Sequence, residues 1–184
     1  MPVPSAQWLP SATRSAIVVP VPETDHLVAS HRRALSAGPA AVPAHVTVLY
    51  PFVHPSMIGA GTIVEIERAL TGIGAFDCAF TQVKWFGEDV VWLEPKPDEH
   101  FRALTRAVCE RFPGHRPYDG EHPETVPHLT IADSRTGDPA TKRRAATDLA
   151  AALPIHARID RVRLVAGTDE HGPWHTVAEF ALRG

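Results

Sequence analysis

The length, composition and charge of the chain are those of an ordinary soluble globular protein. Its 184 residues are enough for one sizeable domain or for two closely packed lobes. A content of 44% hydrophobic and 21% charged residues excludes an intrinsically disordered chain. The formal net charge of −3 argues against long duplex nucleic acid as a partner, because proteins that contact many phosphates normally carry a basic excess. A local basic patch would still serve a short anionic substrate.

The cysteines and the N-terminal segment favour a reduced, cytoplasmic setting. Cys78 and Cys109 are the only cysteines, and their wide spacing fits buried thiols better than a disulfide framework or a zinc site. The first 22 residues have no charged leader and are interrupted by proline, so their apolar runs are too short for a signal peptide or a membrane span. We expect no membrane partner, and we expect residues 1–14 to form a loose arm.

In chain order, the first half of the sequence predicts three strands and two helices. The β-branched segment 15–21 reads as a buried strand, and a helix follows from about Asp25 to Ser36, with Thr24 or Asp25 as its cap. The remaining elements are a strand from Ala44 to about Tyr50, a helix over about 61–71 and a strand over 76–85.

The second half predicts the same order of elements, followed by one closing strand. A strand over 90–94 leads to a helix over about 100–112, and a loop rich in Pro, Gly and His covers 113–127. A short strand begins at His128, and Asp138-Pro139 is a good N-cap and first-turn pair for a helix that extends to about Leu153. Strands over 157–167 and 174–182 complete the chain.

The repeated order of elements indicates an internal duplication. Strand, helix, strand, helix, strand occurs over 15–86 and again over 90–167, with similar spacing in both copies. We therefore predict an α+β fold in which residues 15–184 form a single bilobal domain. Its two pseudo-symmetric β-α-β-α-β lobes, about 15–89 and 90–184, would turn their sheets toward a central cleft, with the helices outside.

The middle strand of each copy carries a histidine and a threonine two residues apart. Residues at this spacing in a strand point to the same face, so His45 projects with Thr47, and His128 projects with Thr130. The apolar residues between and after them point the other way, toward a core. If a pseudo-twofold axis relates the lobes, both pairs meet across the cleft.

Two histidines and two threonines suit the cleavage of a phosphodiester. Imidazole titrates near neutral pH, so one histidine can take a proton from water while the other gives a proton to the leaving alkoxide. Threonine hydroxyls can donate hydrogen bonds to the non-bridging phosphate oxygens, where negative charge sits in the transition state. A single such motif is common in strands by chance, but two copies at matching places in a repeat are much harder to explain in that way.

The segments PAHVTVLYPF (43–52) and VPHLTIAD (126–133) resemble the paired motifs of the 2H phosphoesterase superfamily, in its 2′-5′ RNA ligase-like branch. The duplicated order of elements extends the resemblance over about residues 15–182. It implies the bilobal fold, a 2′,3′-cyclic phosphate or related RNA-end phosphodiester as substrate, catalysis by His45 and His128, and phosphate contacts from Thr47 and Thr130. Both motifs are intact. Because the family also includes ligases and hydrolases of small cyclic nucleotides, the resemblance does not select one substrate.

Four further residues are candidates for substrate binding. Tyr118 lies in the loop before the second motif and is a candidate for the rim of the cleft. Trp92 can stack a base or pack in the core. Arg161 and Arg163 share one strand face, which is either the cleft, where they would attract a phosphate, or a solvated outer face. Lys142-Arg143-Arg144 reads as an exposed helix face.

No pattern of metal ligands stands out. His171 and His175 have the spacing of helical ligands, but Gly172-Pro173 between them would break a helix. We interpret these two, together with His54, His115 and His122, as solvated loop histidines. We expect no metal, no cofactor and no obligate protein partner.

Two other functions remain open for the same cleft. A binding module would hold a phosphorylated nucleotide or RNA end without turnover. An ATP-independent 2′-5′ RNA ligase would join ends that a phosphodiesterase separates. Neither the direction of reaction, nor the acid and base roles of the histidines, nor the oligomeric state can be read from the sequence.

Overall fold

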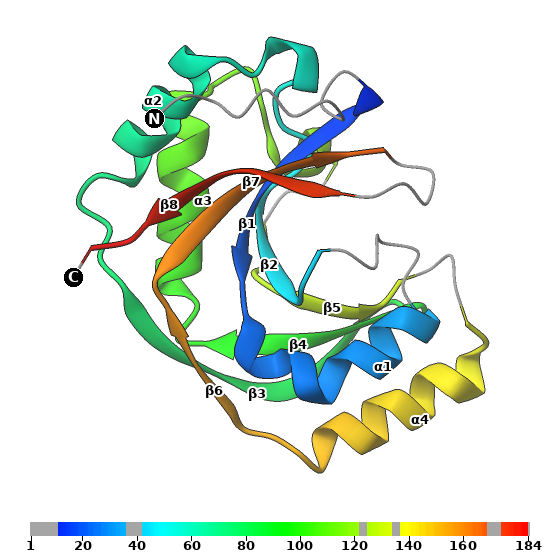
Figure 1. Cartoon of the computed structure of the whole chain (residues 1–184). Helices are drawn as coiled ribbons and strands as arrows, with labels where there is room; N and C mark the ends of the chain where they lie inside the picture. The colour runs from blue at the N-terminus through cyan, green and yellow to red at the C-terminus, as the bar shows by residue number, and fades with distance from the viewer. Residues whose placement is uncertain (1–10, 36–41, 122–124, 134–136, 169–173, 184) are drawn as a thin grey trace.

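The computed structural model describes residues 11–35, 42–121, 125–133, 137–168 and 174–183. Its strands form one curled antiparallel sheet of eight strands in the order β6-β3-β4-β5-β2-β1-β7-β8 (Figure 1). The strand bounds are β1 Arg14–Pro20, β2 His45–Leu49, β3 Phe76–Phe86, β4 Val90–Lys96, β5 Leu129–Ala132, β6 Ile155–Ile159, β7 Arg161–Gly167 and β8 His175–Ala181.

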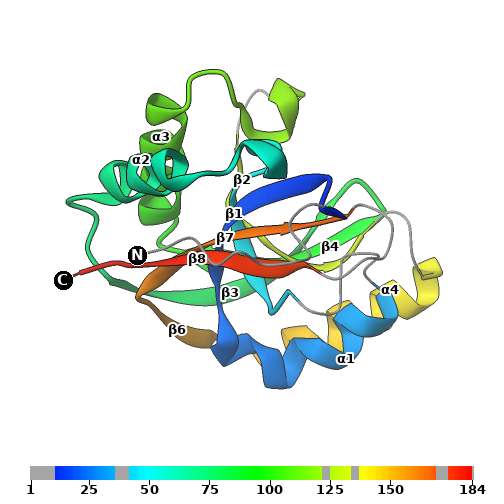
Figure 2. The ribbon, with the colours of Figure 1, turned by 45° about the horizontal axis from the view of Figure 1, so that its top comes forward.

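Four α-helices pack in two pairs. They are α1 Asp25–Leu35, α2 Ala60–Leu70, α3 Glu99–Arg111 and α4 Pro139–Ala150. Helix α2 packs with α3 and α1 packs with α4, and the two pairs lie on opposite sides of the molecule with the sheet between them (Figures 1 and 2). Each motif strand is covered by the helix that precedes the other one, because α3 packs on β2 and α1 packs on β5. The predicted α+β class is confirmed.

The predicted lobes, 15–89 and 90–184, differ from the two halves of this sheet. β3 lies in the first predicted lobe but pairs with β4 and β6. β7 lies in the second predicted lobe but pairs with β1 and β8. β3 and β7 therefore each lie in the half opposite to the one predicted, so the sheet is built from β3, β4, β5 and β6 on one side and from β1, β2, β7 and β8 on the other.

The predicted strand 157–167 is divided into β6 and β7 at Asp160. β6 lies at one edge of the sheet and β7 lies next to the opposite edge. Since a single residue joins them, the curling of the sheet must bring these distant strands together. The backbone there is held by Leu182, whose N–H donates to the Asp160 carbonyl at 2.8 Å.

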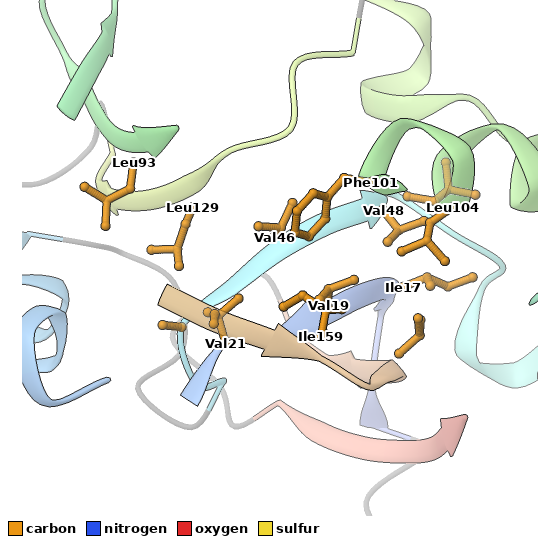
Figure 3. Packing of buried hydrophobic residues seen from close by; sticks show 14 of the residues in the cluster. Ile17, Val19, Val21, Val46, Val48, Leu93, Phe101, Leu104, Leu129 and Ile159 are labelled. Carbon is orange, nitrogen blue, oxygen red and sulfur yellow. The ribbon is translucent and has the colours of Figure 1, made fainter. Parts of the chain in front are cut away.

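The alternating pattern of the motif strands fixes the core. Val46 and Leu129 are register partners on β2 and β5, and both are fully buried. Figure 3 shows them within the central apolar cluster, with Val46 and Val48 close to Phe101 and Leu104 of α3. Burial of these side chains is the main stabilising contribution to the fold. Because Val46, Val48 and Leu129 point into the core, His45, Thr47 and Thr130 lie on the opposite face of these strands.

Asp138 and Lys142, at the start of α4, differ in how well they follow the sequence pattern. Asp138 caps α4 as predicted, because its Oδ1 accepts from the N–H groups of Ala140 and Thr141. Lys142 is not exposed as predicted. It is 3% exposed, and its Nζ donates to the carbonyls of Asp89 and Asp133 at 2.9 and 2.8 Å. Buried ammonium groups are tolerated when such acceptors replace water.

The end of the predicted loose arm is packed. β1 begins at Arg14, Ala12 lies in the core, and the Thr13 N–H donates to the Gly167 carbonyl at 2.8 Å. Residues 1–10 lie outside the described residues. Within the described parts of the chain, no helix is long and apolar enough to cross a membrane.

Candidate active site

The register of β2 and β5 brings the two motifs together. Val46 pairs with Leu129 in an antiparallel ladder. Continued by one residue in each direction, this register places His45 opposite Thr130 and His128 opposite Thr47. Directly opposed residues in an antiparallel pair have Cβ atoms about 4.5–5.5 Å apart. The four side chains therefore form one compact group on the face away from the core, with each histidine beside the threonine of the other motif.

Both histidine rings are held in the same way by the backbone. The His45 Nδ1 lies 2.8 Å from the Pro43 carbonyl, and the His128 Nδ1 lies 2.7 Å from the Val126 carbonyl. A carbonyl oxygen can only accept, so Nδ1 must carry a proton in each ring. This contact fixes the tautomer and leaves Nε2 as the nitrogen that can gain or lose a proton. The carbonyl two residues upstream thus fixes the orientation and the tautomer of each ring.

The segments that lead into the motifs are also anchored. The Asp25 carboxylate at the start of α1 accepts from the Ala44 N–H at 3.0 Å, directly before His45. On the other side, Arg102 of α3 donates to the Thr125 carbonyl at 2.8 Å and is itself held by Asp98 at 2.9 Å. Each motif histidine is therefore fixed by the helix that precedes its strand.

The surroundings of His45 favour its neutral form. Burial, followed by the nearby Arg32 guanidinium, lowers the pKa of His45 to about 4, and the proximity of His128 contributes in the same direction. The hydrogen bond to the Pro43 carbonyl opposes this shift without reversing it. The influence of His128 on this pKa agrees with the closeness of the two rings inferred from the register. At neutral pH the His45 imidazole is therefore uncharged, and its Nε2 is free of a proton.

His128 is surrounded by aromatic rings. Phe86 and Trp92 both meet it edge-on, with ring centroids 5.0 and 5.8 Å away. Trp92 lies opposite Thr130 in the register, but it is only 4% exposed. Phe86 stacks on it at 4.7 Å, and the Lys84 ammonium lies 5.8 Å from its ring centroid. The structure thus places Trp92 beside the site as a packed wall, whereas Phe86, at 38% exposed, forms the accessible surface.

Tyr118 joins the two motifs. Its side chain is hydrogen-bonded to Thr47, its ring stacks on His128 with centroids 6.5 Å apart, and burial raises the pKa of its phenol. The Tyr118 N–H donates to the Tyr50 carbonyl at 2.6 Å. The backbone there is strained, because Tyr118 and Asp119 have φ angles of 52° and 54°. The predicted rim residue therefore contacts one member of each motif.

The two predicted arginines differ in position. Arg163 lines a cavity of about 260 Å³ together with His45, whereas Arg161 lines a neighbouring cavity that His45 does not border. Both are paired with Glu179, Arg163 at 2.8 Å and Arg161 at 3.1 Å, and Arg161 is also bonded to Asp160. Of the two, Arg163 is the one beside the candidate catalytic group.

Sequence reasoning missed Arg32, Phe86 and Trp174. Arg32 is one of several charged residues on α1, and nothing in the spacing distinguishes it. Trp174 follows Gly172-Pro173 in the sequence, and its position in the same cavity lining as His45 depends on the pairing of β7 with β8. Nothing in the alternation of β3 distinguished Phe86 either, because the register shift between Phe80 and Gln82 that precedes it depends on the pairing of β3 with β4.

The remaining histidines and the cysteines were weighed above as metal ligands. Among the residues that the structure describes, no group of three or more His, Cys, Asp or Glu side chains is placed to hold a metal ion. His122 and His171 lie outside those residues. His175 is the first residue of β8 and lines the cavity beside His45, so it is not the solvated loop histidine that was predicted. Cys78 and Cys109 are free thiols, and burial raises the pKa of Cys78 to about 12.

The profile of the 2′-5′ RNA ligase superfamily matches residues 19–170. The chain belongs to this superfamily. The match includes both histidine–threonine motifs, and the predicted resemblance is confirmed. Among curated proteins, no relative matches the chain.

Solved structures of the superfamily share the fold at low sequence identity. Escherichia coli LigT complexed with 3′-AMP is 14% identical, with a TM-score of 0.61 over 94% of this chain and 99% of LigT. LigT complexed with NADP+ is 16% identical, with a TM-score of 0.59 over the same shares. The protein TT0787 of Thermus thermophilus is 16% identical, with a TM-score of 0.65 over 93% of this chain and 98% of that protein. These likenesses establish the LigT-like fold.

Proposed function

We propose that this member of the 2′-5′ RNA ligase superfamily is a metal-independent phosphodiesterase. Its substrate would be a 2′,3′-cyclic phosphate or a related phosphodiester of a nucleotide or RNA end, opened in the cytoplasm by His45 and His128. Thr47 and Thr130 would bind the phosphate. The observation that carries the proposal is the matched pair of histidines, each with Nδ1 on a backbone carbonyl, set beside two threonines on adjacent strands.

The reaction follows from the proton positions. His45, neutral because burial and Arg32 lower its pKa to about 4, takes a proton from a water molecule through Nε2. The water oxygen bonds to phosphorus, and one ring P–O bond breaks. His128, entering the reaction protonated, gives its proton to the leaving alkoxide. By family resemblance the 3′ oxygen leaves, and the product is a 2′-phosphate. After this step His45 carries the proton taken from water, and His128 has lost its own. The reverse transfer must restore both protonation states before the next turnover.

The threonines would stabilise the negative charge that develops on the phosphate in the transition state. A hydroxyl on each side of the phosphorus can donate to a non-bridging oxygen, where charge concentrates in the transition state. Because each threonine sits beside the histidine of the other motif, a phosphate between the strands would meet a donor and a proton-transfer group from both repeats. LigT, which shares this fold, has been solved with 3′-AMP, NADP+, ATP and phosphate, which supports a phosphorylated nucleotide as ligand.

The test is a turnover screen in the presence of a chelator. Purified protein with excess EDTA would be offered nucleoside 2′,3′-cyclic phosphates, oligonucleotides ending in a cyclic phosphate, and ADP-ribose cyclic phosphate. We expect opening of at least one class, with activity unchanged by EDTA. Activity that disappears with EDTA and returns with zinc or manganese would contradict the roles given to the histidines.

The two alternatives have distinct outcomes in the same screen. A binding module would bind the nucleotides without turnover, and loss of His45 would then change affinity alone. A ligase would join a 2′,3′-cyclic phosphate end to a 5′-hydroxyl end, so both directions should be measured on one matched RNA pair. The half-buried, aromatic setting of His128 and the neutral state of His45 favour catalysis, because a binding site for an anion gains little from a histidine kept uncharged.

A further inference from the structure

One wall of the cavity beside His45 is an aromatic ring whose position is determined by several contacts. Trp174 forms this wall, and its Nε1 donates to the Thr168 carbonyl at 3.0 Å. Its ring meets Tyr50 at a tilt, with centroids 6.3 Å apart. It also lies against the backbone of Gly167, where an added Cβ would come within 2.5 Å of ring atoms. Only glycine at 167 permits this approach, so backbone and side chain together determine where the indole sits.

The other lining residues describe the chemistry of the occupant. The described lining combines apolar and polar residues in comparable measure, and its apolar set is Val18, Pro20, Val42, Pro43, Val165 and Trp174. The polar set is His45, Arg163, His175 and Thr176. An indole and aliphatic side chains that face polar groups across one cavity suit a planar organic ring with a polar edge. A second phosphate fits less well, because the Arg163 guanidinium is already paired with Glu179 at 2.8 Å.

The volume of the cavity and its position beside His45 limit which occupants can fit. At about 260 Å³ the cavity is slightly smaller than the usual site for a drug-sized ligand, so it suits one base rather than a dinucleotide. His45 forms part of its lining, so an occupant is adjacent to the phosphate site without filling it. Sequence reasoning gave no role to Trp174, and the mechanism proposed above does not use it.

Resting on the proposed function, we propose that this cavity is a base subsite, in which the nucleobase of the substrate stacks on Trp174. The edge of the base would meet the polar side chains of the lining, while its ribose carries the cyclic phosphate to His45 and His128. Trp174 is thus a specificity-determining residue. It favours substrates that bear a base over sugar phosphates that lack one.

The experiment compares two substrates in the wild-type protein and in three variants of the cavity wall. Adenosine 2′,3′-cyclic phosphate would be measured against methyl ribofuranoside 2,3-cyclic phosphate, which has the same reactive ring and no base. For Trp174→Ala, we expect kcat/KM on the adenosine substrate to fall about 5- to 150-fold, the range for loss of one base–aromatic stack, mainly through KM. Activity on the base-free substrate should stay within about twofold. Trp174→Phe should restore most of the loss, and Gly167→Ala, which displaces the ring without removing it, should resemble Trp174→Ala.

Trp85→Phe is the matched control, because Trp85 packs against the central core rather than lining this cavity. It should leave the ratio of the two substrates unchanged. Equal losses on both substrates in Trp174→Ala, or no loss on either, would overturn the base subsite.

A binding measurement separates this inference from the proposed function. Adenosine 2′-monophosphate and inorganic phosphate would be titrated calorimetrically into the same proteins. If no substrate is opened by the wild-type protein, the proposed function fails, but selective weakening of the adenosine ligand by Trp174→Ala would still support the subsite. If turnover is normal and Trp174→Ala weakens neither ligand or both equally, the subsite fails and the proposed function stands.

Discussion

His45 and His128 are held alike by the backbone, each through Nδ1 and a carbonyl two residues upstream, but the side chains around them differ. Arg32 lies near His45, and a cavity with an indole wall opens beside it. His128 instead lies among Phe86, Trp92 and Tyr118. The ladder between β2 and β5 constrains both backbones in the same way, whereas nothing in the register constrains the side chains that surround them.

This difference suits a reaction that is itself asymmetric. One histidine must accept a proton and the other must donate one, so identical surroundings would set both pKa values alike and serve neither role well. A duplicated fold supplies two equivalent positions. Divergent neighbours can then make one of them the base. We expect His45 to be the base and His128 the acid when a cyclic phosphate is opened.

Removing either histidine should have the largest effect on activity. His45→Ala and His128→Ala should each lower kcat/KM by about 10²–10⁴-fold, the usual contribution of a positioned acid or base. The double variant should lose less than the product of the two, because the pair acts as a unit. Circular dichroism should show intact folding, since Val46 and Leu129 remain in the core. The exposed His156→Ala serves as control. Removal of one histidine with less than a several-fold loss on every substrate would refute the two-histidine mechanism.

The threonines test whether the two motifs contribute equally to phosphate binding. Thr47→Val and Thr130→Val remove one hydroxyl and keep the shape of the side chain. Each should reduce kcat/KM by about 5- to 150-fold, corresponding to roughly 1–3 kcal/mol for a hydrogen bond to a charged oxygen. Steady-state kinetics of both variants would show the losses, with Thr147→Val on the exposed face of α4 as the control. A loss no larger than that control would remove the threonines from the site.

Arg32 tests the electrostatic difference between the histidines. Burial and the Arg32 guanidinium hold the pKa of His45 near 4, so Arg32→Met should raise this pKa toward the ordinary value of 6.5. A base works when it is deprotonated, so the acid limb of the kcat/KM profile should move to higher pH and the loss should be largest between pH 4 and 6. Arg33→Gln, one residue along α1 and exposed, should leave the limb in place. An unchanged acid limb in Arg32→Met would show that Arg32 does not control His45.

The same pKa makes a prediction for stability. Between pH 6.5 and 4 the unfolded chain binds a proton at residue 45 that the folded protein does not bind, so the free energy of unfolding should fall as the pH falls through this window. His45→Gln lacks the titrating group. Its loss of stability between pH 7 and pH 4, measured by denaturant unfolding, should be smaller than that of the wild type. Parallel curves would mean that His45 titrates alike in both states.

Local patterns in the sequence were sufficient for most elements and for the motifs, but they missed the division of 157–167 into β6 and β7 and the contacts between distant segments. The periodicity of two in β2 and β5 predicts that His45 shares a face with Thr47, and the Asp138-Pro139 pair predicts the start of α4. The exchange of β3 and β7 between the halves was not predictable in this way, because strand pairing depends on the whole chain. Lys142 was misread for the same reason, since its acceptors, the carbonyls of Asp89 and Asp133, come from other elements.

The smallest expected effect concerns Tyr118, where the two motifs are in contact through one side chain. Its phenol is hydrogen-bonded to Thr47 and its ring stacks on His128. Tyr118→Phe keeps the ring and removes the hydroxyl, so it should release Thr47 and lower kcat/KM by about 2- to 12-fold, the equivalent of roughly 0.5–1.5 kcal/mol for one hydrogen bond. Tyr118→Ala also removes the stack and should cost more.

A positioning role for Tyr118 predicts a specific form of this loss. If the hydroxyl acts only by orienting Thr47, combining Tyr118→Phe with Thr47→Val should cost no more than Thr47→Val alone, because the partner to be oriented is already gone. The same change combined with Thr130→Val should multiply the two losses. A double-mutant cycle in kcat/KM on one cyclic phosphate measures both couplings. Equal coupling to Thr47 and Thr130 would show that Tyr118 acts on the substrate directly, and the contact between the motifs would then have no separate role.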